Sequence, residues 1–233
     1  MAEKETALIV GTGRGLSASL ARLFAREGMQ VALAARDTEK LADLVSATGA
    51  KAYSCDAIEP AAVAALFDNV VKDIGTPDLV VYNASNRGGR GPVTELDPEA
   101  VKHAILVTCY GGFLVAQTAA RLMLERGSGT ILFTGASASY KGYANSSSFA
   151  MGKFGLRGLA QSLARELAPQ NIHVGHFPID GGILARDDPR AASRPEDGML
   201  DPDAIAETYL NVHRQHRSAW SWEVELRPWT ESF

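Results

Sequence analysis

Six short runs of apolar residues recur along the first 177 positions of the chain, and none of them alternates with polar residues. A strand covered by helices on both faces buries all of its side chains, so uninterrupted runs of this kind predict strands of a parallel sheet. The predicted strands are Ala7–Val10, Val31–Ala35, Ala52–Cys55, Leu79–Tyr82, Thr130–Thr134 and Ile172–Phe177.

Segments with a helical pattern and recognisable ends lie between these strands. A helix from about Leu16 to Glu27 is expected to end at Gly28, which favours the left-handed conformation there. Asp97-Pro98 and Asp201-Pro202 each place a capping carboxylate before a proline at the first helical position. The alternation of strand and helix predicts right-handed βαβ units. We therefore expect an α/β fold, a doubly wound, Rossmann-like parallel sheet in which residues 1–233 form a single domain.

Two loops interrupt this alternation. Asn86–Pro92 is rich in glycine and arginine and follows the fourth strand, whereas residues 183–200 are polar and show no periodicity. Loops after the carboxyl ends of strands bind ligands in such sheets, so we expect residues 183–200 to form a lid over a substrate. A surface insertion without a function explains the second segment equally well.

Composition and charge narrow the classes of partner. The formal net charge is −4 and 46% of the residues are hydrophobic, so neither nucleic acid nor an anionic membrane surface is an expected partner. No signal peptide is expected, and the uncharged stretch from Ala104 to Gln117 is expected to form a buried helix because it is short for a membrane span. Cys55 and Cys109 lack metal-ligand spacing, so we expect free thiols, no metal site and a cytoplasmic protein.

A glycine-rich turn directly follows the first predicted strand and precedes the first predicted helix. In that context glycines allow a tight turn and let backbone N–H groups approach a pyrophosphate at the helix N-terminus. The turn therefore predicts a dinucleotide site, with contacts from Gly11, Gly13, Arg14, Gly15 and Leu16.

The end of the second predicted strand indicates which dinucleotide is bound. An acidic residue there would hold the ribose hydroxyls of NAD, but the strand ends in Ala35-Arg36, and Asp37 is the first acid. The planar guanidinium of Arg36 can pair with a 2′-phosphate, and Arg14 can approach the same group from the glycine turn. These features favour NADP(H), although either arginine can also be a plain surface charge.

The turn Gly11-x-x-x-Gly15-x-Ser17 resembles the Gly-x-x-x-Gly-x-Gly turn of the short-chain dehydrogenase/reductase family, with serine replacing the last glycine. Cys55-Asp56 is similar to the family's adenine-contacting segment, and Tyr82–Ser85 is similar to its Asn-Asn-Ala-Gly segment. The resemblance spans about residues 6–183. It implies that the cofactor also contacts Asp56, Asn83 and Ala84.

The catalytic positions depart from the family's pattern. The family uses a tyrosine, a lysine four residues later, a serine about thirteen residues before the tyrosine, and an asparagine from the preceding helix. At these positions this chain carries Phe149, Lys153, Ala136 and Thr108. The resemblance implies that Lys153 still binds the nicotinamide ribose.

Loss of the phenol matters because hydride transfer to a carbonyl leaves an alkoxide that must receive a proton. Loss of a general acid costs about 10²–10⁴ in rate, and Ala136 offers the developing oxyanion no hydroxyl. Substitute groups lie nearby in Ser137, Tyr140, Tyr143 and Ser146; Tyr143 is the favoured acid, with Ser137 and Lys153 as further catalytic candidates. A C=N or conjugated C=C substrate needs no such acid.

Two functions remain open from the sequence. One is an atypical NADP(H)-dependent oxidoreductase acting on an unidentified small molecule; the other is a catalytically inactive NADP(H)-binding sensor or partner subunit. The guanidinium groups of Arg87 and Arg90 are candidates for binding an anionic group, but the presence of both arginines is explained equally well if they are solvent-exposed charges on a loop. A homodimer or homotetramer is expected, because in the family the two long helices, here about Glu99–Glu125 and Ser146–Leu167, form the subunit contact.

Overall fold

A computed structural model describes residues 4–185 and 188–232, and its centre is a six-stranded parallel sheet. The strand order is β3-β2-β1-β4-β5-β6. Strands β2 and β3 are therefore added on one side of β1, and β4, β5 and β6 are added on its other side. This arrangement confirms the doubly wound sheet and all six predicted strands, with boundaries that shift by one residue at most. The strands are β1 (Thr6–Val10), β2 (Gln30–Ala35), β3 (Lys51–Ser54), β4 (Leu79–Tyr82), β5 (Gly129–Thr134) and β6 (Ile172–Phe177).

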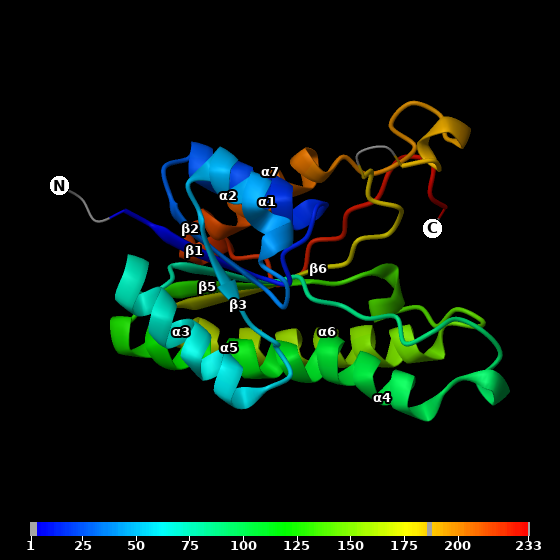
Figure 1. Ribbon diagram of the computed structural model, residues 1–233, viewed down its shortest axis with the longest axis horizontal. Helices are drawn as coiled ribbons and strands as arrows, with labels where there is room; N and C mark the ends of the chain where they lie inside the picture. The colour runs from blue at the N-terminus through cyan, green and yellow to red at the C-terminus, as the bar shows by residue number, and fades with distance from the viewer. Residues whose placement is uncertain (1–3, 186–187, 233) are drawn as a thin grey trace.

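Helices cover both faces of the sheet (Figure 1). One layer holds α1 (Leu16–Arg26), α2 (Ala42–Thr48) and α7 (Pro202–His213), and the other holds α3 (Pro60–Ile74), α4 (Pro98–Ile105), α5 (Gly111–Arg126) and α6 (Ser147–Leu167). The predicted caps are confirmed, since Asp97 and Asp201 accept hydrogen bonds from the backbone N–H groups of Glu99 and Asp203. Gly28 has a φ of 87°, the left-handed conformation expected after the first helix.

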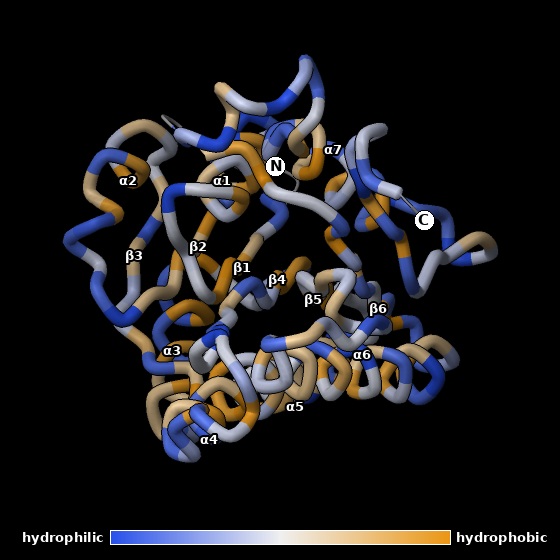
Figure 2. Tube along the Cα trace, turned by 90° about the vertical axis from the view of Figure 1, so that its right-hand side faces the viewer, coloured by the Kyte–Doolittle hydropathy of each residue, from blue (hydrophilic) through white to orange (hydrophobic). Residues whose placement is uncertain are grey.

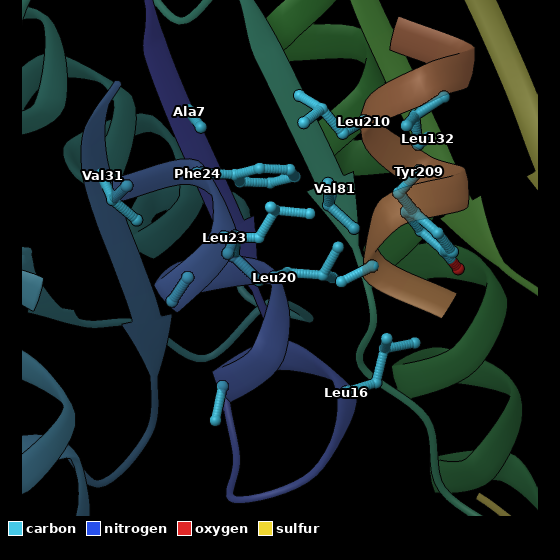
Figure 3. Close-up of a cluster of buried hydrophobic side chains, with 14 of the residues drawn as sticks. Ala7, Leu16, Leu20, Leu23, Phe24, Val31, Val81, Leu132, Tyr209 and Leu210 are labelled. Carbon is cyan, nitrogen blue, oxygen red and sulfur yellow. The ribbon is translucent and has the colours of Figure 1, made fainter. Parts of the chain in front are cut away.

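The apolar core lies in two layers, one on each face of the sheet, and Figure 2 shows the hydrophobic residues concentrated along the strands and the helices that cover them. On the α1/α7 face, Phe24 and Leu20 pack between β1 and α7, and Tyr209 stacks on Phe177 with ring centroids 3.7 Å apart (Figure 3). Burial of an aromatic or leucine side chain contributes about 1.5–3 kcal/mol to folding. The second layer fixes α3, α5 and α6 beneath β4 and β5.

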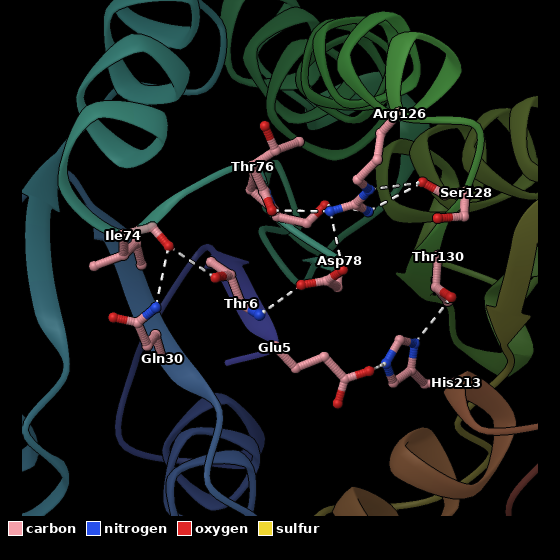
Figure 4. Close-up of polar contacts among 11 residues, drawn as sticks. Glu5, Thr6, Gln30, Ile74, Thr76, Asp78, Arg126, Ser128, Thr130 and His213 are labelled. Carbon is pink, nitrogen blue, oxygen red and sulfur yellow. Dashed lines mark hydrogen bonds and ion pairs between the residues drawn. The ribbon is translucent and has the colours of Figure 1, made fainter. Parts of the chain in front are cut away.

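Polar contacts hold the amino-terminal edge of the sheet (Figure 4). The Asp78 carboxylate accepts a 2.7 Å hydrogen bond from the backbone N–H of Thr6 and forms a 2.9 Å ion pair with Arg126. His213 bridges Thr130 and Glu5. These contacts align the starts of β1, β4 and β5, and the carboxyl ends of the same strands lie at the opposite edge.

The long helix predicted at about Glu99–Glu125 is confirmed, and it extends at both ends beyond the uncharged stretch from Ala104 to Gln117. α4 and α5 are joined through Leu106–Tyr110 into one helix from Pro98 to Arg126, which by length and composition alone is sufficient to cross a membrane. The buried helix that the sequence predicted is confirmed in part, because 44% of its most apolar window is buried against the rest of the chain. A core helix of a globular domain has the same length and composition, so this feature is weak evidence for a membrane span.

Candidate active site

A cavity of about 490 Å³ opens at the carboxyl ends of the strands, where the strand order reverses. Ligands bind at this point in open α/β sheets because the loops after neighbouring strands separate there. Most of the predicted cofactor contacts line the cavity, namely Gly11, Gly13, Arg14, Arg36, Asp56, Asn83 and Ala84. Gly15 and Leu16 lie at the start of α1 instead, and Leu16 is buried beneath the turn.

The first glycine of the turn is required by the packing of two loops. Gly11 has a φ of 85°, and a Cβ atom at this position would lie 2.3 Å from the backbone nitrogen of Ala84. The backbone N–H groups of Gly11 and Thr12 both donate to the carbonyl of Ala34, which closes the turn over β2. The turn is therefore pressed against the loop after β4.

Ser17, which replaces the last glycine of the turn, is a buried polar link. Its hydroxyl donates to the carbonyl of Gly11 at 3.1 Å and accepts from the Asn83 side chain at 2.7 Å. Asn83 follows β4, so this pair of hydrogen bonds joins the glycine turn to the neighbouring strand end. The sequence indicated only that a serine replaces the last glycine of the turn.

The adenosine end of the cavity is lined by cations. Arg14, Arg36 and Lys40 line it, and the only carboxylates in the described lining are Asp37 and Asp56. Asp37 forms a 2.7 Å ion pair with Lys40, which holds the pKa of the Asp37 carboxyl below its usual value. Arg14 and Arg36 have no ion-pair partner within the described residues, so their guanidinium groups are available to an anion.

A second cavity of about 390 Å³ adjoins the first, and Asn83 and Ser85 line both. Its wall combines the loop after β4, the start of α6 and the segment after β6. The lining includes Arg87, Ala136, Phe149, Lys153 and Arg190. A dinucleotide that fills the first cavity would place its other end here.

Lys153 is buried at the wall of this second cavity. Its side chain is only 3% exposed, and its Nζ donates a 2.7 Å hydrogen bond to the Thr134 carbonyl at the end of β5. Burial, reinforced by the nearby charge of Arg87, lowers the pKa of Lys153 from 10.5 to about 7. The ammonium is thus close to its titration point at neutral pH.

Phe149 lies between Lys153 and the loop after β4. The Arg87 guanidinium carbon is 4.6 Å from the centre of the Phe149 ring, and Lys153 Nζ is 5.8 Å from it. Cations at these distances are attracted to the negative face of an aromatic ring. The Phe149 side chain is therefore an apolar part of the cavity wall that contacts a cation.

Thr108 lies in a π-helical turn, Leu106–Tyr110, between α4 and α5. Such turns occur often at functional sites because they redirect one side chain out of the helical repeat. The buried Thr108 hydroxyl accepts from the Asn86 N–H at 3.1 Å and donates to the Asn86 carbonyl at 3.2 Å. This residue therefore fixes the loop after β4.

The other proposed catalytic residues, Ser137 and Tyr143, lie in the segment between β5 and α6. Ser137 begins a short 3-10 helix and its backbone N–H donates to Ile179, while the Ala136 N–H donates to the Ser139 hydroxyl. Tyr143 is 47% exposed, and neither it nor Ser137 lines the described part of the cavity wall. Their catalytic roles stay predictions.

Sequence reasoning missed a buried polar group behind the site. His176 on β6 lies 3.0 Å from Glu223 and 3.4 Å from Ser139, and Glu223 forms a bidentate pair with Arg157. Burial lowers the pKa of His176 to about 4, so it is neutral at neutral pH. Glu223 comes from the C-terminal segment, which runs beside β6 and covers that sheet edge. No local sequence signal links these distant residues.

The predicted lid, residues 183–200, begins and ends beside the second cavity; residues 186 and 187 lie outside the described part. Ile183 pairs with Leu200, and backbone hydrogen bonds join Leu184 to Leu200 and Leu200 to Gly182. Arg190 reaches the cavity wall from the body of the segment. Its closure over a ligand stays a prediction.

We expect trypsin to cut the free protein after Arg190 and to cut it more slowly at saturating NADPH, because lids become ordered over ligands. The rate at which intact chain disappears measures this, and an Arg190→Gln variant identifies the cut. Equal cleavage with and without NADPH would remove the lid interpretation.

Comparison with known proteins agrees with this geometry. A family model described as short chain dehydrogenase matches residues 5–178. Cis-4-hydroxycyclohexanecarboxylate dehydrogenase of Sinomonas cyclohexanicum is 30% identical over 218 residues, which cover 88% of this chain and 87% of that protein.

Two solved structures share the fold over nearly the whole chain. A short-chain dehydrogenase from Rhodopseudomonas palustris is 35% identical to this chain and superposes on it with a TM-score of 0.83. The alignment covers 97% of this chain and 99% of the other. A metagenomic short-chain oxidoreductase in complex with NADP is 27% identical, with a TM-score of 0.81, and covers 96% and 97% of the two chains. This chain belongs to the short-chain dehydrogenase family.

Proposed function

We propose that the protein is an atypical NADP(H)-dependent oxidoreductase that transfers hydride to or from a C=N or conjugated C=C bond of a small molecule. One observation carries the proposal: Phe149 stands in the cavity wall beside Lys153, where the family's pattern places a phenol. When bound, the nicotinamide supplies or accepts the hydride. A conjugated C=C bond can then take its proton from water, and an iminium carbon needs none.

The choice of NADP(H) rests on the cations at the adenosine end. Arg14 and Arg36 carry no ion pair among the described residues, and Lys40 already neutralises Asp37. A 2′-phosphate pairs well with such guanidinium groups, whereas Asp37, the first acid after β2, is already paired with Lys40. The related structure that contains NADP supports the same choice.

The residues of the second cavity would orient the reacting groups. Asn83 lies where both cavities meet, and Lys153 is held by Thr134 so that its remaining N–H groups are available to the nicotinamide ribose. Phe149 and Ala136 present carbon to the substrate and offer it no hydroxyl.

A comparison of three cyclic acceptors tests this function. With NADPH, we expect cyclohex-2-enone to be reduced at its C=C bond and tetrahydropyridine at its C=N bond, each faster than cyclohexanone is reduced. The loss of NADPH absorbance gives the rates, and proton NMR of the products, which distinguishes cyclohexanone from its isomer cyclohex-2-enol, shows which bond was reduced. Preferential reduction of cyclohexanone would contradict the proposal.

The absence of the usual acid also favours a second candidate, a nucleotide-responsive sensor or partner subunit without catalysis. Tight NADPH binding combined with no turnover of any of the three acceptors would support it.

We propose a cytoplasmic homodimer or homotetramer in either case, because both thiols are free and α5 and α6 expose apolar side chains. These exposed side chains are Phe113 and Leu124 on α5 and Met151 and Phe154 on α6.

A further inference from the structure

We propose that the substrate of the second cavity carries an anionic group, a carboxylate in the first instance, which Arg87 binds above the ring of Phe149. This inference rests on the proposed function, because it names the substrate class of the same site. It concerns only the cavity beside Lys153 and not the cations that face the nucleotide.

The charge of the second cavity is the first observation. Arg87, Lys153 and Arg190 all line it, and no aspartate or glutamate does so within the described residues. The positive charge of Arg87 also lowers the pKa of Lys153, so the two cations lie close enough to repel each other. A bound anion would relieve this repulsion.

Of the three cations, Arg87 has the least compensated charge. Arg190 is neutralised by Asp188, whose carboxylate accepts from its Nε and NH2 at 2.9 Å and 2.6 Å. Lys153 donates to a backbone carbonyl. The Arg87 guanidinium has no hydrogen bond or ion pair in the described parts of the chain, and its contact is the Phe149 ring at 4.6 Å.

The loop also holds Arg87 in place. The Arg87 carbonyl accepts a 2.6 Å hydrogen bond from Ser148, and both backbone groups of Asn86 are bonded to Thr108. On the other side, Gly88 donates to the Asn86 side chain and packs so tightly that a Cβ atom would lie 2.6 Å from Ala104. A guanidinium on a fixed backbone, stacked on a ring, is preorganised for a planar carboxylate.

This charge refines the choice among acceptors. Compared with cyclohexenone and tetrahydropyridine, which carry no anionic group, the better acceptors are expected to be an unsaturated carboxylic acid and an imine that carries its own carboxylate. In both of the latter, the carboxylate binds Arg87 and the C=C or C=N bond is presented beside Lys153.

Matched carboxylates and amides test the proposal by binding alone. The probes are acetate, cyclohexanecarboxylate and benzoate, each compared with its neutral amide of the same shape, on protein saturated with NADPH. Bound NADPH occupies the cations of the first cavity, so they contribute nothing to the preference. We expect at least one carboxylate to bind about tenfold tighter than its amide, as a charge-assisted hydrogen bond provides.

The variants separate Arg87 from its neighbours. Arg87→Gln should abolish the preference for carboxylate and Arg87→Lys should keep part of it, while Arg90→Gln, on the same loop but outside the cavity lining, should leave it unchanged. Unaltered NADPH affinity shows that each variant is folded. A preference that survives Arg87→Gln, or no preference in any pair while NADPH binds, overturns this inference and leaves the proposed function intact. Failure of the unmodified protein to bind NADPH overturns both.

Discussion

Changing Phe149 to tyrosine together with Ala136 to serine is expected to raise the rate of ketone reduction by about 10²-fold or more. Both residues line the second cavity, and Lys153 Nζ lies 5.8 Å from the centre of the Phe149 ring. A phenol at this position would extend beside the Lys153 ammonium, whose positive charge favours the ionised form of the phenol. The introduced serine would donate a hydrogen bond to the oxyanion that forms on the substrate. The rate is measured as NADPH consumed with cyclohexanone.

A matched control uses the same chemical change on the same helix. Phe154 is 45% exposed and lies outside the described lining of the cavity, so Phe154→Tyr should leave ketone reduction unchanged. Brisk ketone reduction by the unmodified protein would contradict the account of a missing acid. Tyr143→Phe then distinguishes the causes, because it abolishes that activity only if Tyr143 is the acid.

Arg36→Asp is expected to invert the cofactor preference, so that NADH binds tighter than NADPH. The change removes a cation that faces the 2′-phosphate and supplies the carboxylate that holds ribose hydroxyls. Each of these effects is worth about tenfold in affinity, as charged hydrogen bonds are. Arg22→Asp on α1, outside the lining of the nucleotide cavity, is the control for charge alone. Retention of the original preference in the Arg36 variant would show that another group selects the phosphate.

The fold could be predicted from the sequence because most strands are short apolar runs and three helices have recognisable end signals at Gly28, Asp97 and Asp201. The run Leu79–Tyr82 and the caps at Asp97 and Asp201 are local features, and the structure contains all of them. The lining of the first cavity could be predicted equally well, because the strand order and the glycine turn place its residues at one edge of the sheet.

What could not be predicted depends on contacts between distant segments. The Arg87 contact with Phe149 joins residues 62 positions apart, so no local pattern in the sequence indicates it. The π-helical turn at Thr108 interrupts a segment whose pattern indicated one regular helix. His176 and Glu223 meet because the C-terminal segment returns to β6, a path that no local pattern records.

The central claim, that this fold holds NADP(H), is tested most directly by the affinities of the unmodified protein for NADPH and NADH. Both are measured by equilibrium titration in one buffer of fixed ionic strength, because salt screens exposed charges such as those of Arg14 and Arg36. The account predicts that NADPH binds at least about tenfold tighter than NADH. Equal affinity for the two, or binding of neither, would contradict it.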